Sequence, residues 1–350
     1  MGDKRLITLA AMLSAFIASA PLAAQAPRPG ALEIYKDWTI GCDNRSRCEA
    51  VSLLPDGGEW PDKPVALGLV REAGGAADPE IWVSRDTHGQ EDVSFLVDGR
   101  KIATAASRDG EARLQGPQAA ALAIAMARGT KLELRSAGAV IARPSLAGAA
   151  AAMRYMDARQ GRAGTQAALV ATGALAANAV RPAPPLPLIR RAVIPAGAAP
   201  VTLWREELAA VGKFTGCADE MRDASPPELH RLSKTETLVL VPCGAGAYNY
   251  SAVPVIATGI PGRRSFRHAA FDYQPGWSED AAHPTLVNAS WTPESSSLES
   301  YAKGRGIGDC GSSESYVWDG IRFRLASASA MGECRGAWHW ITTWSAKVVP

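Results

Sequence analysis

Alternating apolar and polar positions predict short strands through much of the N-terminal half of the chain. Residues 32–40 and 48–54 are expected as strands on either side of a turn rich in Asp, Asn, Arg and Ser. Residues 93–97 and 100–103 predict a hairpin, because Asp-Gly between them can supply the positive backbone φ angles of a two-residue turn. A further strand pair is expected at 131–135 and 140–143.

Two helices are expected to lie against this antiparallel sheet. An Ala-rich run over 117–128 predicts the first, which Gly129 would end. Ser145 could cap the second, which would run to about Gly161. One face of that helix would carry Leu146, Ala149, Ala150, Met153 and Met156.

The C-terminal half shows a denser series of short strand patterns. Strands are expected at 237–241, 248–257, 265–273, 285–291 and 298–302. A second Asp-Gly hairpin is expected over 315–325, and short helices at 202–211 and 226–232. The predicted fold class is α+β, mainly β, with an antiparallel meander or sandwich in this half.

A proline-rich stretch divides the two halves. Residues 181–200 hold six of the 24 prolines, which disfavour both helix and sheet, so an extended connector is expected. The alternative is a fixed strap packed across both domains. The predicted organisation is a signal peptide over 1–26, an N-terminal domain over 27–180 and a C-terminal domain over 201–350.

The first residues resemble an export signal. Lys4 and Arg5 precede an apolar run over 6–20, and Ala24 and Ala26 give the small-x-small pattern of a cleavage site. Cleavage is expected near Ala24 or Ala26. Because no later stretch is apolar enough to span a membrane, a soluble periplasmic product is expected.

Export favours disulfides for the six cysteines, which are Cys42, Cys48, Cys217, Cys243, Cys310 and Cys334. Pairing of nearest neighbours is preferred, although six cysteines allow 15 pairings. A zinc site is disfavoured because the chain has no C-x-x-C and no nearby paired His. Some of the thiols could instead be small buried apolar residues.

Charge argues against a nucleic-acid partner. The chain carries 37 basic and 35 acidic residues, so its net charge of +2 gives no general positive field. No metal or cofactor is expected, and the oligomeric state stays open.

Gly306, Gly308 and Gly311 spell G-x-G-x-x-G, the pattern of a nucleotide-binding loop. A strand hairpin follows them, so the helix N-terminus that would hold a pyrophosphate is missing. The preferred interpretation is a compact turn pinned by Cys310. In a further alternative, Arg305 and Asp309 belong to a loop that binds a small ligand or a partner.

No catalytic set emerges from the sequence. The chain has no G-x-S-x-G and no H-E-x-x-H, and its five histidines are isolated from one another. Trp338, Trp340 and Trp344 would share one face of a final strand. A core face is the preferred interpretation, and an aromatic platform for sugar rings is the alternative.

Three groups of residues resemble a known family. They are Asp37 and Trp38 with 41–44 and Cys48; 145–149 with 157–165; and 302–311 with 318–320 and 333–335. Together they resemble the bacterial domain of unknown function numbered 1176, over nearly the whole mature chain. The resemblance implies an exported proteobacterial protein with no established catalytic residues. The first half also resembles invasion-associated locus B proteins.

The sequence therefore predicts a non-enzymatic periplasmic protein that binds an unknown envelope protein or glycan. One form of this hypothesis is an inhibitor that resembles the periplasmic lysozyme inhibitors. The alternative is an envelope hydrolase with an unrecognised site. A pocket that holds Ser or Asp near a His would favour the hydrolase.

Overall fold

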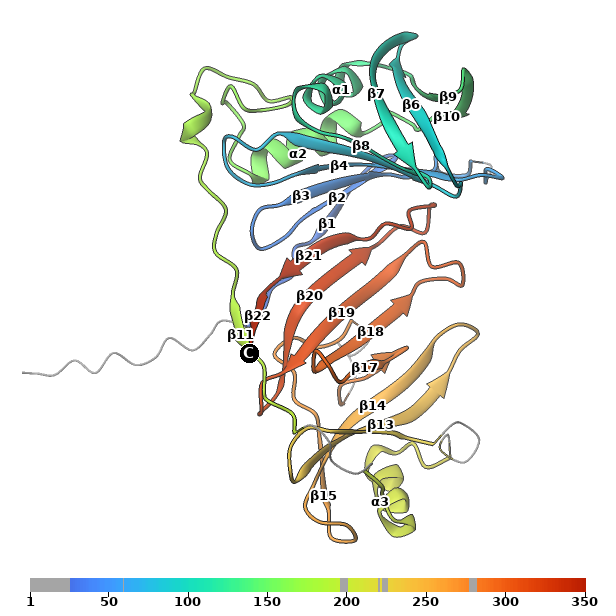
Figure 1. Cartoon of the computed structure of the whole chain (residues 1–350), viewed down its shortest axis with the longest axis vertical. Helices are drawn as coiled ribbons and strands as arrows, with labels where there is room; N and C mark the ends of the chain where they lie inside the picture. The colour runs from blue at the N-terminus through green and yellow to red at the C-terminus, as the bar shows by residue number, and fades with distance from the viewer. Residues whose placement is uncertain (1–25, 59, 196–200, 220, 222–225, 277–281) are drawn as a thin grey trace, which may run out of the picture.

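The computed structural model describes residues 26–58, 60–195, 201–219, 221, 226–276 and 282–350. The expected signal sequence lies outside them, apart from Ala26. Three tiers follow one another along the long axis of the molecule (Figure 1). The fold is mainly β with antiparallel sheets, which confirms the predicted class.

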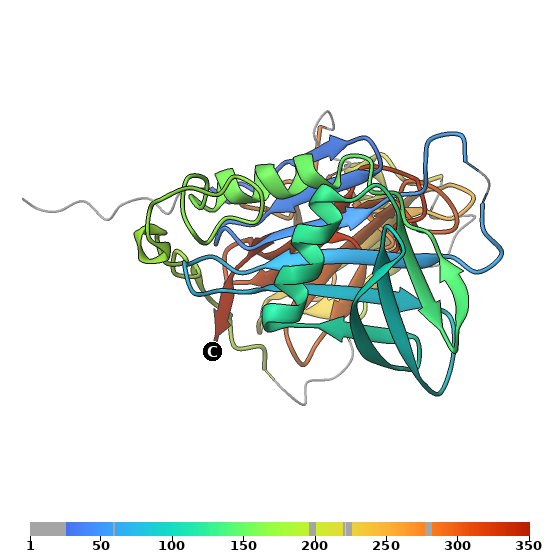
Figure 2. The same ribbon diagram turned by 90° about the horizontal axis from the view of Figure 1, so that it is seen from above.

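The first tier is a ten-stranded antiparallel sheet with the order β1-β2-β3-β4-β5-β8-β7-β6-β9-β10. Its strands are β1 (Leu32–Tyr35), β2 (Trp38–Cys42), β3 (Cys48–Ser52), β4 (Val65–Arg71), β5 (Pro79–Arg85), β6 (Gln90–Val97), β7 (Arg100–Arg108), β8 (Glu111–Leu114), β9 (Leu132–Ser136) and β10 (Ala139–Ala142). Helices α1 (Gly116–Arg128) and α2 (Ala149–Arg159) cover one face of it (Figure 2). Between the sheet and the helices, Leu67 and Phe95 of the sheet and Leu122 of α1 are fully buried.

The second tier is a five-stranded sheet in chain order. It contains β17 (Ser290–Thr292), β18 (Ser297–Lys303), β19 (Gly311–Trp318), β20 (Phe323–Met331) and β21 (Ile341–Ser345).

The third tier is a smaller sheet with one helix. It contains α3 (Arg205–Thr215), β12 (Glu228–Arg231), β13 (Glu236–Ala245), β14 (Tyr250–Thr258), β15 (Ser265–His268) and β16 (Leu286–Val287). Leu240 and Ile256 pack with Tyr316 of the second tier. Val239 and Val253 pack with Val211 of α3 instead, so the sheet is buried on both faces.

The first and second tiers share a hydrophobic contact. The sheet face opposite the helices places Val51 and Trp82 against Met331 and Ile341 of the second tier. An ion pair between Asp37 and Arg335, 2.5 Å apart, lies at the same junction. The lower face of strands β3 to β5 is therefore packed against the C-terminal half.

The described part of the proline-rich stretch contacts both halves. It carries β11 (Leu188–Arg190), which pairs in parallel with β22 (Lys347–Val349), and follows the short 3₁₀ helix Ala177–Ala179. Arg45 donates to the Pro184 carbonyl oxygen at 3.2 Å, and the Ala192 N–H donates to the Trp318 carbonyl oxygen at 2.8 Å. The boundaries of two separate domains stay a prediction.

Three expected elements differ from the structure. The single strand expected over 32–40 is a hairpin, because Lys36 adopts a φ of 56° and turns the chain between β1 and β2. The helix expected over 226–232 is wrong, since strand β12 pairs there with β13. Helix α2 starts only after Gly148, whose φ is 97°, and Ser145 Oγ accepts from the Ala147 N–H instead of capping the helix.

Strand boundaries in the C-terminal half also differ. The strand expected over 265–273 ends at His268, and the one expected over 285–291 is divided into β16 and β17. Strands β4, β5 and β8 were not predicted. Tertiary packing decides strand ends, which pattern alone does not give. The second Asp-Gly hairpin also differs from the expected two-residue turn, because Trp318 pairs with Phe323 and residues 319–322 form the loop.

The three disulfides join Cys42 to Cys48, Cys217 to Cys243 and Cys310 to Cys334, which is the nearest-neighbour pairing that the sequence favours. Each bridge lies within one half of the chain. None of the described helices is long and apolar enough to cross a membrane.

Candidate functional site

The glycine-rich segment is the loop between β18 and β19. The Gly304 N–H donates to the Cys310 carbonyl oxygen at 2.8 Å, which closes the loop at its base. A Cβ at Gly304 would lie 2.6 Å from Cys310 Sγ, so glycine is required where the chain passes the disulfide. Strand β19 begins at Gly311, and the described residues from there to 350 contain strands and no helix. The segment is thus a disulfide-pinned turn.

Arg305 and Asp309 form a two-pronged ion pair across this loop. Arg305 Nε and a terminal nitrogen donate to the two oxygens of Asp309 at 2.7 and 2.6 Å. Asp309 is fully buried and also accepts from the Gly336 N–H at 2.7 Å. Burial opposes its ionisation, but the hydrogen bonds from Arg305 and Gly336 outweigh that effect and lower its pKa. Asp309 therefore shapes the loop, and Arg305 alone of the pair faces outward.

Two exposed tryptophans stand beside Arg305. Its guanidinium lies 5.1 Å from the centre of the Trp60 ring, which is a cation–π distance. The Trp60 ring meets Trp338 edge to face, with centroids 5.6 Å apart. Trp338 Nε1 in turn donates to the Ile307 carbonyl oxygen at 3.3 Å. We call Trp60, Trp338 and Arg305 the aromatic rim.

The other two tryptophans of the predicted platform have different surroundings. Trp340 stacks on Tyr301 with centroids 4.7 Å apart, beneath the loop. Trp344 is partly buried and donates to the Leu325 carbonyl oxygen at 3.1 Å. Trp338 precedes β21 and is 39% exposed, so the three residues do not form one face.

A cavity of about 460 Å³ opens beside the aromatic rim, between the two halves. One wall comes from β5 and β8 of the first tier, and Trp338 and His339 form the other. The wall on the sheet side carries Ser84, Glu111 and Arg113. A second hollow of about 670 Å³ shares Glu111 and Arg113 and extends along β6 and β7. The lining therefore combines indole faces with charges of both signs.

His339 is held in this cavity by a buried carboxylate. Its Nε2 lies 2.8 Å from Glu49 Oε1, and the same oxygen accepts from Trp82 Nε1 at 3.1 Å. Burial opposes ionisation of Glu49, but His339 and Arg47 outweigh it and lower its pKa. An ionised Glu49 fixes the imidazole against Trp82, whose ring centroid is 4.5 Å away.

Sequence reasoning found only part of this site. It singled out Arg305, Asp309 and Trp338, and the structure places Trp338 and Arg305 in one cluster. It missed Trp60, Glu49 and His339, because residues from both halves meet only after folding. Trp60 lies in a polar loop, and no local pattern marks it as part of a site.

The histidines are not all isolated from one another, which corrects that expectation. His268 and His283 stack with centroids 4.9 Å apart, and Phe214 stacks on the other face of His268. Burial and the neighbouring His283 lower the pKa of His268. This pair lies in the third tier, away from the cavity.

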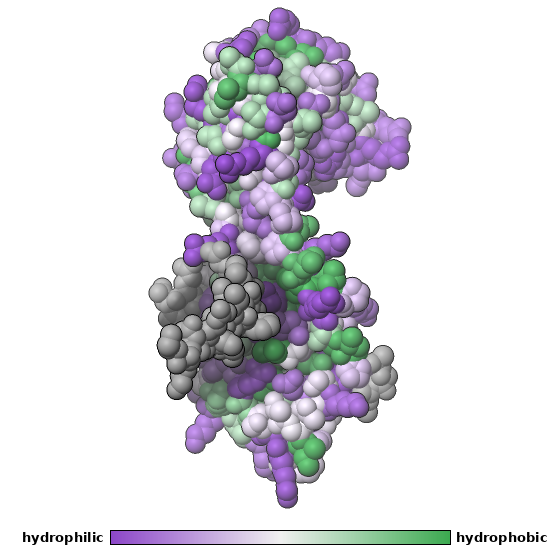
Figure 3. All heavy atoms as spheres, turned by 90° about the vertical axis from the view of Figure 1, so that its left-hand side faces the viewer, coloured by the Kyte–Doolittle hydropathy of each residue, from purple (hydrophilic) through white to green (hydrophobic). Residues whose placement is uncertain are grey.

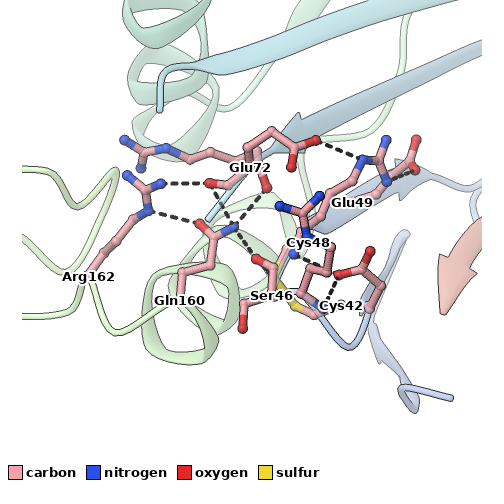
Figure 4. Close-up of a disulfide and its surroundings, with 11 residues drawn as sticks. Cys42, Ser46, Cys48, Glu49, Glu72, Gln160 and Arg162 are labelled. Atoms are coloured by element: carbon pink, nitrogen blue, oxygen red, sulfur yellow. Dashed lines mark hydrogen bonds and ion pairs between the residues drawn. A yellow bond between two sulfur atoms is a disulfide. The ribbon is translucent and has the colours of Figure 1, made fainter. Parts of the chain in front are cut away.

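The residues near Cys42 that carry the family resemblance have a structural role. Figure 4 shows how Gln160 and Arg162, just after α2, reach the disulfide turn and the segment after β4. Gln160 Nε2 donates to the Ser46 carbonyl oxygen at 2.8 Å, and Arg162 donates to the Glu72 carbonyl oxygen at 2.7 Å. Arg162 is fully buried. These contacts tie three loops together.

Comparison with known proteins gives a family and one curated relative. The family model described as a protein of unknown function, DUF1176, matches residues 32–347. The chain is similar to the uncharacterized protein YpfG of Escherichia coli K12, with 26% identity over 338 residues, which cover 89% of this chain and 91% of that protein. No solved structure matches.

The expected resemblance to invasion-associated locus B proteins is not shown by these comparisons. The family match, in contrast, includes the disulfide turn, the segment after α2 and the glycine-rich loop. The chain therefore belongs to the DUF1176 family.

Proposed function

We propose that this chain is an exported, periplasmic binding protein for a glycan of the cell envelope, which it binds at the aromatic rim. One observation carries the proposal: Trp60 and Trp338 are 45% and 39% exposed in mutual contact, and Trp338 lines the cavity between the halves. Exposed indoles in contact at the mouth of a cavity are typical of a binding surface.

The chemistry of the rim suits sugar rings. A pyranose has an apolar face that can stack on an indole and an edge of hydroxyls that needs hydrogen-bond partners. Glu111, Arg113 and His339 supply such partners within the same cavity. Because both charge signs are present, a neutral or weakly charged glycan fits better than a polyanion.

Two features support export. The first residues have the pattern of a signal peptide, and all six cysteines are paired, which is typical of an oxidising compartment. Murein is the abundant glycan of the periplasm, and we therefore take it as the first ligand to test.

Trp338→Ala is expected to weaken binding to murein about tenfold, because one half-exposed indole contributes about 1–2 kcal/mol as a binding anchor. The measurement is co-sedimentation of the mature protein with purified murein sacculi over a range of protein concentrations. Trp204→Ala is the matched control, since Trp204 is 55% exposed but lies at the start of α3 in the third tier. Equal loss in both variants would contradict the placement of the site.

Inhibition of a lytic enzyme can be distinguished from glycan binding by the protein concentration that each requires. If the ligand is a lytic enzyme, the protein would slow lysozyme on sacculi at concentrations too low to cover the murein. Inhibition that increases only in proportion to the amount of protein bound to murein would favour a glycan over a lytic enzyme as the ligand.

Hydrolysis is a second candidate function, since the cavity that holds His339 also contains Ser84 and Asp86. An imidazole oriented by a buried carboxylate can act as a general base. If the protein cleaves a bond in its ligand, His339→Gln is expected to lower the rate at least a hundredfold. Product release from sacculi measures this, with His230→Gln as control because His230 contacts Glu228 on the third tier. Absence of any release by the unaltered protein would reject the second candidate.

A further inference from the structure

Exposed aromatic side chains are concentrated along one edge of the molecule. Six large aromatic residues of the described chain are exposed, and four of them, Trp60, Trp338, Tyr248 and Tyr250, lie on or beside turns at that edge. In Figure 1 the β13–β14 and β18–β19 turns follow one another on the right-hand side. On the opposite side (Figure 3), hydrophobic residues form small patches separated by hydrophilic ones. We call these four residues the aromatic edge.

Hydrogen bonds and close contacts connect the aromatic edge across the glycine-rich loop. Tyr248 Oη donates to the Gly304 carbonyl oxygen at 3.2 Å, and a Cβ at Gly306 would lie 3.4 Å from its ring. Ile307, 55% exposed, follows in the loop and accepts the hydrogen bond from Trp338. Tyr250 is two residues from Tyr248 and 64% exposed at the start of β14. Rings from both sheets of the C-terminal half thus flank one loop.

Two turns of the aromatic edge are held in place by contacts within the fold. The loop is fixed by the Cys310–Cys334 disulfide and lies over the stacked rings of Tyr301 and Trp340. Asn249 fixes the β13–β14 turn to the loop, since its Nδ2 donates to the Lys303 carbonyl oxygen at 2.8 Å and its Oδ1 accepts from the Lys303 N–H at 3.2 Å. A preformed surface of this kind loses little conformational entropy when a ligand binds.

The length of the aromatic edge determines the size of ligand that can contact all of its rings. The cavity ends at Trp338 and His339, whereas Tyr248 and Tyr250 lie beyond the loop on the third tier. A ligand confined to the cavity would leave both tyrosines unused. A chain of repeating sugar rings would meet one aromatic ring after another, with the Tyr248 hydroxyl and the Arg305 guanidinium near its hydroxyl edges.

We propose that the aromatic edge binds a linear glycan of several sugar units, which starts at the cavity, crosses the glycine-rich loop and ends at Tyr250. This inference rests on the proposed glycan-binding function and specifies its ligand as a polymer. Trp338 would contact the sugar units at the cavity. Tyr250 would contact only the units at the opposite end of the aromatic edge.

The test is the dependence of affinity on chain length. The mature protein is titrated with β-1,4-linked N-acetylglucosamine oligomers of two and of six units, with calorimetry as the readout. The hexamer is expected to bind at least tenfold more tightly than the dimer. Tyr250→Ala should reduce the affinity for the hexamer about tenfold and leave that for the dimer unchanged, while Trp338→Ala should reduce both. Trp204→Ala is the control that should change neither.

The outcomes distinguish failure of the extended site from failure of the glycan-binding function. Equal affinities for dimer and hexamer, or equal loss for both in Tyr250→Ala, would overturn the extended site and leave the glycan-binding function standing. No binding of either oligomer, together with no binding of murein strands, would overturn both. Circular dichroism of each variant establishes that it is folded, since Tyr250 is on the surface and its backbone N–H keeps its bond to Asn288.

Discussion

Glu314→Gln is expected to stabilise the protein at pH 8 by about 3 kcal/mol and to leave its stability at pH 4 nearly unchanged. Glu314 is buried in β19, and burial raises its pKa from 4.5 to about 7, although hydrogen bonds with Ser312 and Gly276 act in the opposite direction. Within the described residues, neither Glu314 Oε2 nor Tyr316 Oη has a hydrogen-bond partner. The charged carboxylate is therefore poorly compensated in the folded state.

The direction of the pH effect follows from the raised pKa. The folded state binds this proton more tightly than the unfolded state, so the free energy of unfolding falls as pH rises from about 4.5 to about 7 and is then level. Thermal unfolding of the unaltered protein and of Glu314→Gln from pH 4 to pH 9 measures the difference in their free energies of unfolding. Taking the difference removes the contribution of other titrating groups. Glu299→Gln, exposed on the adjacent strand β18, should show no such difference. A difference in free energy of unfolding between the unaltered protein and Glu314→Gln that is the same at all pH values would contradict the raised pKa of Glu314.

Arg162→Met is expected to destabilise the first tier by about 4 kcal/mol, because it removes a fully buried guanidinium that donates to several partly buried carbonyl oxygens, while preserving apolar volume. Arg162 donates to the carbonyl oxygens of Glu72 and Gly74 at 2.7 and 2.6 Å, and to Gln160 Oε1 at 2.9 Å. Burial lowers its pKa to about 10, so the guanidinium is still charged at neutral pH.

Chemical denaturation measures the loss in free energy of unfolding. The stability of Arg162→Lys should lie between that of the unaltered protein and that of Arg162→Met, since lysine retains the charge but not the planar set of donors. Arg154→Ala, exposed on helix α2, is the control and should change stability by less than about 0.5 kcal/mol. A loss below about 1 kcal/mol in Arg162→Met would mean that water or rearranged loops satisfy those carbonyls.

Local chemistry made several elements predictable from the sequence. Asp98 and Gly99 both adopt positive φ and form the hairpin turn that their residue types indicate. The disulfides followed from neighbouring cysteines in an export context. By contrast, Lys36 turns the chain at a positive φ that its residue type disfavours, so tertiary contacts determine that turn.

The site was less predictable because its parts come together only in the folded chain. Glu49 and His339 are 290 positions apart in numbering, and neither has a local pattern that marks it. The glycine-rich loop could be recognised as a turn from the strand after it, but nothing in its own residues indicates Trp60 or Tyr248 as neighbours. Trp338 was predicted in a buried strand, whereas the strand begins three residues later.

Glycan binding at the aromatic rim is open to direct measurement. Calorimetric titration of purified murein glycan strands into the mature protein and into the Trp60→Ala, Trp338→Ala double variant tests it most directly. We expect saturable binding to the unaltered protein and a loss of at least a hundredfold in affinity in the double variant, with circular dichroism unchanged. Binding of equal strength in both proteins, or none to the unaltered protein, would contradict it.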